Sequence, residues 1–157
     1  MYSASLIAAA IVQKAIDEGD PVTQMKLQKM VYFANGYNLA KRDQKLIEED
    51  FQAWKFGPVV PTIYNDYQLY GNMAISNFDK SRSIYGSLGF DESSLGEDAK
   101  DAINYTWKAT AHLSAADLSK WTHKEDGPWA KVYNQLEPSI KIDDNDIKAY
   151  FKNFLYS

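Results

Sequence analysis

Apolar residues recur along much of the chain at the 3.6-residue spacing of an amphipathic helix. The first such stretch follows Ser3 and Ser5, which favour helix N-caps, and stops at Gly19, which suits a left-handed helix end. A second stretch begins after Thr23. Its apolar stripe consists of Leu27, Met30, Val31, Ala34 and Tyr37. The pattern therefore predicts two consecutive helices.

The spacing changes between Leu46 and Phe56, where alternation toward the end of the segment is typical of a short strand. Gly57-Pro58 ends this strand, and Pro61 opens a third helix at its first position, where a missing N–H costs nothing. Gly71 closes that helix. Its tyrosines are Tyr64, Tyr67 and Tyr70.

The segment 72–96 is predicted to be a loop-rich, variable connection. Together with Gly71 it holds four of the eight glycines and six serines, with only scattered apolar residues. Short strands are expected at Met73–Phe78 and Ser83–Tyr85. Long loops in compact domains are more often functional than random ones.

The helical spacing resumes from Ala99 to Thr110. Ser114 with Asp117 predicts a capped short helix, and Gly127-Pro128 introduces another that carries Trp129, Val132, Tyr133 and Leu136. A last helix over 144–156, capped by Asp143 or Asp144, has a strongly apolar stripe and should dock on the body. The pattern thus predicts one mainly α domain over 1–157, a compact bundle of six or seven helices with a small β element.

Composition indicates the cellular compartment and the class of partner to expect. The chain has no cysteine, no basic leader at its start and no apolar run long enough to span a bilayer, so a soluble, cytoplasmic protein is expected. Lysine and arginine total 17 against 21 acids, and only two of the cations are arginine. This balance disfavours nucleic-acid binding.

Aromatic residues make up 14% of the chain, with four Trp, eleven Tyr and seven Phe. Any single ring is best explained as core packing. The excess of tyrosine as a class favours an interaction surface, because tyrosine combines apolar area with a polar group.

No residue pattern predicts catalysis, a metal or a cofactor. His112 ends a predicted helix, where its charge suits the helix dipole, and His123 has no nucleophile or carboxylate in a known motif relation to it. Two histidines eleven residues apart match no zinc spacing, and no glycine-rich phosphate loop is present. The acidic clusters, including 143–146, are expected to be solvated helix starts. The sequence therefore favours a binding protein over an enzyme.

Three stretches together resemble the Panacea domain, the fold of SocA-like and phage-associated antitoxins. They are 25–34, with its Lys-Leu-Gln-Lys-Met-Val-Tyr-Phe core; 51–61, with Ala-Trp-Lys-Phe-Gly-Pro; and 118–129, with Trp-Thr-His and Gly-Pro-Trp. The middle stretch is the most specific. The resemblance covers roughly residues 4 to 136 and implies a mainly helical fold with a small β element.

The resemblance also implies an antitoxin, encoded beside its toxin, that neutralises it by direct protein–protein contact. Toxins paired with this domain include translation inhibitors of the tRNA-pyrophosphorylating, alarmone-synthetase-like kind. One family member is instead similar in role to a proteolytic adaptor that delivers its toxin to a ClpXP-type protease. The antitoxin is the first hypothesis here and the adaptor the alternative. A hydrolase or transferase centred on His123 and a nucleic-acid binder are further alternatives.

The shared motif residues are interpreted first as scaffold, with Trp54 and Trp129 packing, Gly57-Pro58 turning the chain and His123 fixing a turn. Toxin choice would then depend on variable surface, especially 72–96 and the exposed aromatics. The third helix is the expected shared contact edge. The candidate partner-binding residues are Trp54, Phe56, Tyr64, Tyr67, Tyr70 and His123. No oligomeric state follows from the sequence.

Overall fold

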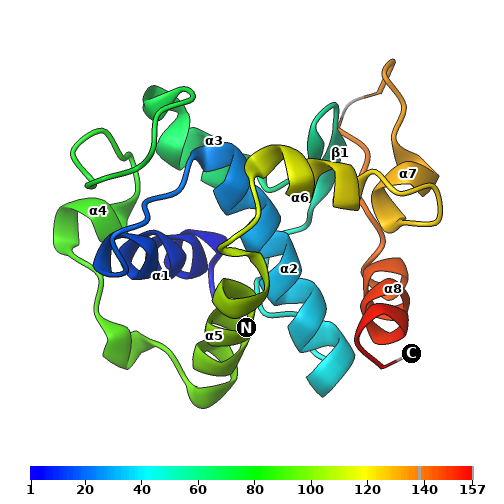
Figure 1. Ribbon diagram of the computed structural model, residues 1–157, viewed down its shortest axis with the longest axis horizontal. Helices are drawn as coiled ribbons and strands as arrows, with labels where there is room; N and C mark the ends of the chain where they lie inside the picture. Colours follow the sequence, from blue (N-terminus) through cyan, green and yellow to red (C-terminus); the bar gives the residue numbers. More distant parts are fainter. Residues whose placement is uncertain (138, 157) are drawn as a thin grey trace.

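A computed structural model of the chain describes residues 1–137 and 139–156 (Figure 1). The fold is mainly α with one two-stranded sheet, which confirms the predicted class. The α-helices are α1 (Ala4–Asp17), α2 (Gln24–Arg42), α3 (Pro61–Tyr67), α4 (Ile84–Leu88), α5 (Glu97–Thr110), α6 (Ala115–Thr122), α7 (Pro128–Val132) and α8 (Asp144–Tyr156). The strands are β1 (Gln52–Trp54) and β2 (Gly57–Val59), and the 3₁₀ helices are η1 (Gln68–Tyr70) and η2 (Glu92–Ser94).

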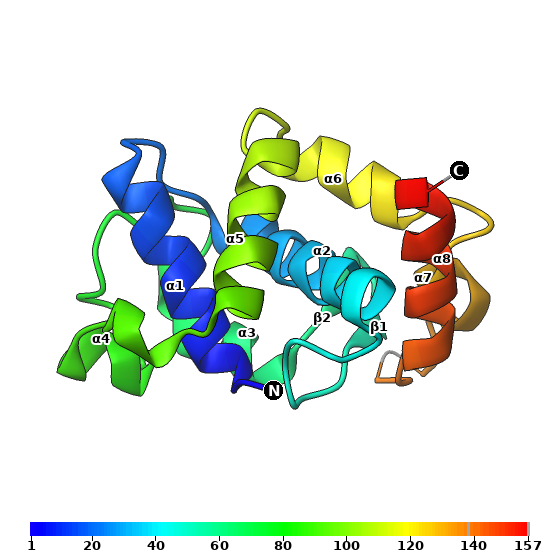
Figure 2. The ribbon, with the colours of Figure 1, turned by 90° about the horizontal axis from the view of Figure 1, so that it is seen from below.

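Helix α2 is the central element of the fold. It contacts α1, α3, α5, α6, α8 and β2, and Figure 2 shows it enclosed by them. Every residue from Leu27 to Ala40 is buried, including the polar ones. The sequence pattern predicts a single apolar stripe on this helix. The structure buries all of its faces because neighbours pack around the whole helix.

Three of the buried polar side chains on α2, those of Gln28, Asn35 and Asn38, hydrogen-bond the backbone of connecting segments, as buried polar groups generally require. The Gln28 amide donates to the Val60 carbonyl (3.2 Å) and accepts from the Val60 N–H (3.0 Å). The side-chain oxygen Oδ1 of Asn35 accepts hydrogen bonds from the backbone N–H groups of Leu46 and Ile47. Asn38 donates to the carbonyl of residue 44. The central helix therefore positions the segments before β1 and before α3.

Strands β1 and β2 form an antiparallel hairpin with Trp54 opposite Gly57. Gly57 has a φ of +123°, a conformation that L side chains rarely adopt, so a glycine allows the reversal. The segment before α8 also pairs with β1, since the Ala53 N–H donates to the Ile140 carbonyl and the Ile142 N–H to the Phe51 carbonyl. The hairpin is thereby held from two sides.

Helix α8 packs against α2 through an aromatic cluster. The Phe151 ring is fully buried and meets the rings of Tyr32, Phe33 and Trp121 at centroid distances of 5.4–5.6 Å. Gly36 lies directly beneath this ring, because a Cβ at that position would come within 2.2 Å of it. The absence of a side chain at Gly36 therefore sets how closely α8 approaches α2.

The segment 72–96 differs from its prediction. The strands expected at 73–78 and 83–85 do not form. Ser83 instead caps α4, which adds one helix to the expected set. The segment is tied to the body by the Ile75 N–H, which donates to the Val22 carbonyl, and by the Arg82 N–H, which donates to the Asp66 carbonyl. These backbone bonds to distant residues replace the local pairing that a hairpin would need.

Helix α7 is shorter than its sequence pattern suggests. It stops at Val132, and Tyr133 has extended backbone angles. Leu136, expected on the same helix, lies beyond it and is 84% exposed. The apolar spacing in the sequence continues to Leu136, but the helix ends at Val132, where the chain turns away.

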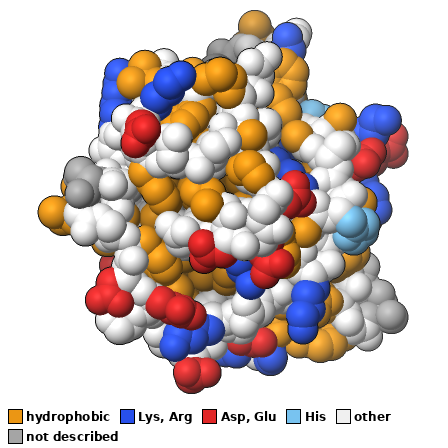
Figure 3. Space-filling model, turned by 60° about the vertical axis from the view of Figure 1, so that its left-hand side comes forward, with side chains coloured by type: hydrophobic (Ala, Val, Ile, Leu, Met, Phe, Trp, Pro, Cys, Tyr) orange, Lys and Arg blue, Asp and Glu red, His pale blue; other side chains and the backbone are white. Residues whose placement is uncertain are grey.

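Charged side chains of both signs are scattered over the face shown in Figure 3, with lysine and arginine dispersed among acids rather than gathered in one stripe. No helix in the described part of the chain has the length and apolar character that a membrane span requires.

Candidate functional site

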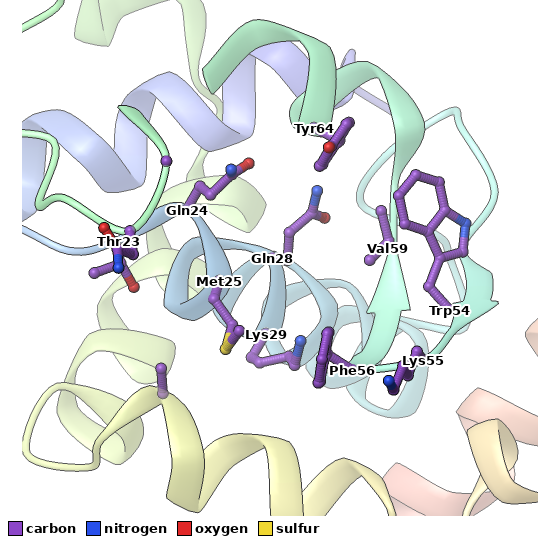
Figure 4. Close-up of a pocket in the computed structure, with 13 residues that line it drawn as sticks. Thr23, Gln24, Met25, Gln28, Lys29, Trp54, Lys55, Phe56, Val59 and Tyr64 are labelled. Carbon is purple, nitrogen blue, oxygen red and sulfur yellow. The ribbon is translucent and has the colours of Figure 1, made fainter. Parts of the chain in front are cut away.

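A groove of about 630 Å³ opens between the first half of α2, the β1–β2 hairpin, α3 and the start of α6 (Figure 4). Its size falls within the usual range for binding pockets. The lining residues are Thr23, Gln24, Met25, Gln28, Lys29, Trp54, Lys55, Phe56, Val59, Tyr64, Gly71, Asn72 and Ala115. Two stretches of the resemblance, 25–34 and 51–61, thus meet at one concave surface.

The rim of the groove exposes large apolar side chains. Phe56 at the hairpin turn is 56% exposed, and Met25 on α2 is 39% exposed. The rings of Trp54 and Tyr64 pack at 5.3 Å and form one wall. Leu69 and Met73, which flank the lining residues 71–72 in the chain, are also exposed. A concave apolar surface with aromatic edges is typical of a site that binds a protein segment.

The hairpin that carries Trp54 and Phe56 is fixed by α6 and α7. The Trp129 indole N–H donates to the Trp54 carbonyl (2.7 Å), and the Ser119 hydroxyl donates to the Phe56 carbonyl (2.8 Å). Trp129 stacks between His123 (3.8 Å, interplanar angle 7°) and Tyr133 (4.4 Å, 14°). The third stretch of the resemblance therefore positions the hairpin from behind.

His123 is part of this support and does not line the groove. Burial and the nearby Lys29 cation lower the pKa of His123, whereas its hydrogen bond with the Phe56 backbone raises it. Its buried Nε2 atom has no hydrogen-bond partner among the described residues. A neutral imidazole stacked face to face on an indole is well suited to packing. His112 lies beyond the end of α5 and is exposed.

Lys29 is the unusual residue of the groove. Its side chain is only 2% exposed, and within the described residues its ammonium makes no hydrogen bond or ion pair that would offset burial. Burial lowers the pKa of Lys29 to about 8, because a low-dielectric surrounding disfavours the charged form. Figure 4 shows the side chain directed along the groove toward Phe56.

The predicted partner-binding residues separate into three groups. Trp54, Phe56 and Tyr64 line the groove, whereas His123 lies behind the hairpin. Tyr67 and Tyr70 are buried, with exposed fractions of 0% and 4%. The surface position expected for these two is therefore corrected: α3 and η1 turn both rings into the body.

The two buried tyrosines stabilise the fold at this point. The Tyr70 hydroxyl donates to the Asn77 carbonyl (2.5 Å) and accepts from the Lys80 N–H (3.1 Å), so it anchors the start of 72–96. Burial raises the pKa of Tyr67 well above its usual value. Neither ring is presented to a partner in this conformation.

Sequence reasoning missed Met25, Gln28 and Lys29 as groove residues. Lys29 lies outside the apolar stripe of its helix, so the spacing gives no indication that it is buried. Its one distinguishing signal was its place beside Leu27 and Met30 in a helix that carries few charges. Its burial depends on the hairpin, which packs over it from elsewhere in the sequence.

A second apolar surface lies on α5 and α8. Tyr105 stacks on Tyr37 at 4.4 Å, and Phe154 packs edge-on against Trp121 at 5.4 Å, yet both remain partly exposed. Tyr156 beyond them is 66% exposed. None of these residues lines the groove. The described residues contain no cluster of three metal-ligating side chains.

Comparison with known proteins identifies relatives. Residues 27–130 match the family described as "Antitoxin SocA-like, Panacea domain". The chain is also similar to the protein named "Antitoxin SocA" of Caulobacter vibrioides (strain NA1000 / CB15N), with 30% identity over 154 residues, which cover 95% of this chain and 82% of that protein. No solved structure matches the present chain. The matched range includes the groove residues Gln28 and Lys29 on α2, the hairpin, and His123 and Trp129 of the stack behind it.

Proposed function

Because the chain belongs to the SocA-like Panacea family of antitoxins, we propose that it neutralises a cognate toxin by direct protein–protein binding at the groove. The observation that carries this proposal is the apolar rim around a concave surface, in which Met25 and Phe56 are exposed and Trp54 and Tyr64 are half-buried. Apolar side chains kept exposed on a rigid support lose little conformational freedom when a partner covers them.

The support for the hairpin favours binding over catalysis. Phe56 sits on a two-residue turn. Ser119 donates to the Phe56 carbonyl and Trp129 to the carbonyl of Trp54 just before the turn, so the ring is presented in a defined place. Such preorganisation raises affinity without any chemical step. The protein would act in the cytoplasm as a stoichiometric inhibitor, without a cofactor and without nucleic acid.

The proposed toxin is the product of the adjacent gene, of the translation-inhibiting class that the family resemblance implies. A tRNA-pyrophosphorylating, alarmone-synthetase-like enzyme is the specific expectation. A stable complex would bury about 1,600 Å² in total, and an area of that size extends beyond the groove onto surrounding surface. Segment 72–96, which begins at the groove with Asn72, is the proposed source of toxin choice.

The alternative function, an adaptor for a ClpXP-type protease, needs a second binding surface. The exposed rings of Tyr105, Phe154 and Tyr156 form one on α5 and α8. Phe151, on the same helix α8, is fully buried and belongs to the core. An adaptor would therefore use Phe154 and Tyr156.

A co-expression experiment tests both functions. The adjacent gene product is expressed alone and together with this chain, growth is scored, and the complex is captured by a tag on either protein. Rescue with a co-purifying complex is expected. Normal growth with the neighbour alone, and no complex, would reject the antitoxin function.

Repeating the rescue in a host that lacks the protease separates the two mechanisms. Direct neutralisation predicts rescue in both hosts, and inhibition of the purified toxin by the purified chain. Rescue that disappears without the protease would instead establish the adaptor.

A further inference from the structure

The ammonium group of Lys29 lies in an environment that is unfavourable for a charge. The residue is only 2% exposed yet lines the groove. Its surroundings there offer no carboxylate, because the described groove residues include two lysines, Lys29 and Lys55, and no acid. Burying an unpaired charge is among the most costly arrangements in a folded protein. A charge kept there without a partner points to a partner that arrives from outside.

The space around Lys29 is left open by the backbone of the hairpin. A Cβ at Gly57 would lie 2.8 Å from the Lys29 Cε atom and 3.1 Å from Nζ. The Thr122 hydroxyl lies 3.0 Å from the same Cβ position and donates its proton to the Ser119 carbonyl (2.8 Å). The absence of a side chain at Gly57 therefore leaves room for the end of the Lys29 side chain.

Other groups add to the positive potential at this place. The N-terminal residues of α2 line the groove, and the first turn of that helix carries no acidic residue to offset its dipole. Lys55 at the hairpin turn lies on the rim and adds a second positive charge. The potential thus favours an anionic group that enters between Phe56 and α2.

We infer that the groove binds an aspartate or glutamate side chain of the cognate toxin, with its carboxylate on the Lys29 ammonium. Apolar neighbours of that acid would pack on Phe56, Met25 and Trp54. A carboxylate fits this site better than a phosphate group, because one ammonium in an apolar pocket can pair with one charge, whereas phosphate sites gather several donors. This inference rests on the proposed function and specifies its recognition chemistry.

The test uses the purified chain and the purified product of the adjacent gene. Lys29→Met removes the charge and keeps an apolar stem of similar length. Lys108→Met is the matched control, since this lysine on α5 is exposed and lies outside the groove. Loss of one partner of a buried charge pair predicts an affinity about 30-fold or more below that of the unmodified chain for Lys29→Met. The control should change affinity less than about threefold.

The outcomes distinguish the two proposals. Equal affinity of Lys29→Met and the unmodified chain would overturn the inference and leave the antitoxin function intact. Failure of the unmodified chain to bind would overturn both. On the toxin side, one Asp→Asn or Glu→Gln change should cause the same loss and add nothing to Lys29→Met.

A measurement on the unmodified chain keeps the inference testable even if the variant does not fold. With ¹³Cε-labelled lysine, NMR reports the pKa of Lys29 in the free chain and in the complex. Pairing with a carboxylate should raise that pKa from about 8 toward the ordinary lysine value of about 10.4. An unchanged or lower pKa in the complex would overturn the inference.

Discussion

The indole N–H of Trp129 donates a 2.7 Å hydrogen bond to the backbone carbonyl of Trp54. These two tryptophans lie 75 positions apart in the sequence. The bond joins α7 to the end of β1, directly before the turn that exposes Phe56. One side chain therefore couples the helix pair behind the hairpin to the rim of the groove.

Trp129→Phe should lower the free energy of unfolding by about 1–3 kcal/mol, because it leaves the part-buried Trp54 carbonyl without its donor. Urea denaturation measures this loss. Tyr133→Phe is the control, since it keeps the outer ring of the stack and removes a hydroxyl that makes no hydrogen bond within the described structure. Equal stability of the two variants would show that the hydrogen bond contributes little.

Gly36→Ala should destabilise the protein even though alanine is the better helix former. Helix propensity alone predicts a gain of about 1 kcal/mol. The new Cβ would however lie 2.2 Å from a fully buried Phe151 ring, and overpacking of this kind costs about 1–3 kcal/mol. Limited proteolysis should cut α8 of the variant sooner than that of the unmodified chain.

A second substitution checks the cause of that loss. In a double-mutant cycle, adding Phe151→Leu to Gly36→Ala should cost less than the sum of the two single changes, because the smaller side chain gives way to the new methyl group. Additive losses would show that the destabilisation by Gly36→Ala does not come from a clash with the Phe151 ring.

Stability should depend on pH through Lys29. The pKa of this residue is about 8 in the folded chain and about 10.4 when unfolded, so between these values the unfolded state binds the extra proton. The unfavourable contribution of the buried charge is complete below pH 8 and is relieved as pH rises toward 10. Its full size is about 3 kcal/mol.

Comparison with Lys29→Met isolates this contribution from that of the tyrosines. Below pH 8 the difference in unfolding free energy, variant minus unmodified chain, should be at its most positive. It should fall by about 2–3 kcal/mol by pH 10. Denaturant titrations of both proteins across this range measure the difference, and one that is independent of pH would contradict the assigned pKa.

Phe56→Ser should weaken toxin binding about tenfold or more while changing stability by less than about 0.5 kcal/mol, because the ring is mostly exposed yet central to the rim. Leu136→Ser is the matched control, since this residue is 84% exposed and lies outside the groove. Competition binding and thermal unfolding measure the two effects. Equal affinities of the two variants would exclude Phe56 from the interface.

The sequence predicted best those features that depend on neighbouring residues. Thr23 caps α2 by accepting from the Lys26 N–H, and Ser114 with Asp117 forms the expected capping box on α6. The hairpin before Pro61 was expected as a short strand and a turn, and its turn residue Gly57 has the positive φ that a glycine allows. The family resemblance, carried by three such local stretches, is confirmed.

Features that depend on distant packing were not predictable in the same way. Tyr67 and Tyr64 are three residues apart on one short helix, yet only Tyr64 lines the groove. Which ring turns inward depends on the docking of α3 against α1 and α2. Lys29 is buried only because the hairpin packs over it. The spacing of residues within 25–34 gives no indication of that contact, because the hairpin lies elsewhere in the sequence.

The contact between Gly36 and Phe151 has a consequence for the order of events during synthesis. The two residues are more than a hundred positions apart, and chains emerge from the ribosome with the N-terminal part first. The aromatic face of α2 therefore remains uncovered until α8 has been synthesised. Until then a nascent chain would expose Tyr32, Phe33 and Trp121 to chaperones and proteases, so these rings become protected only once α8 has been synthesised and has docked.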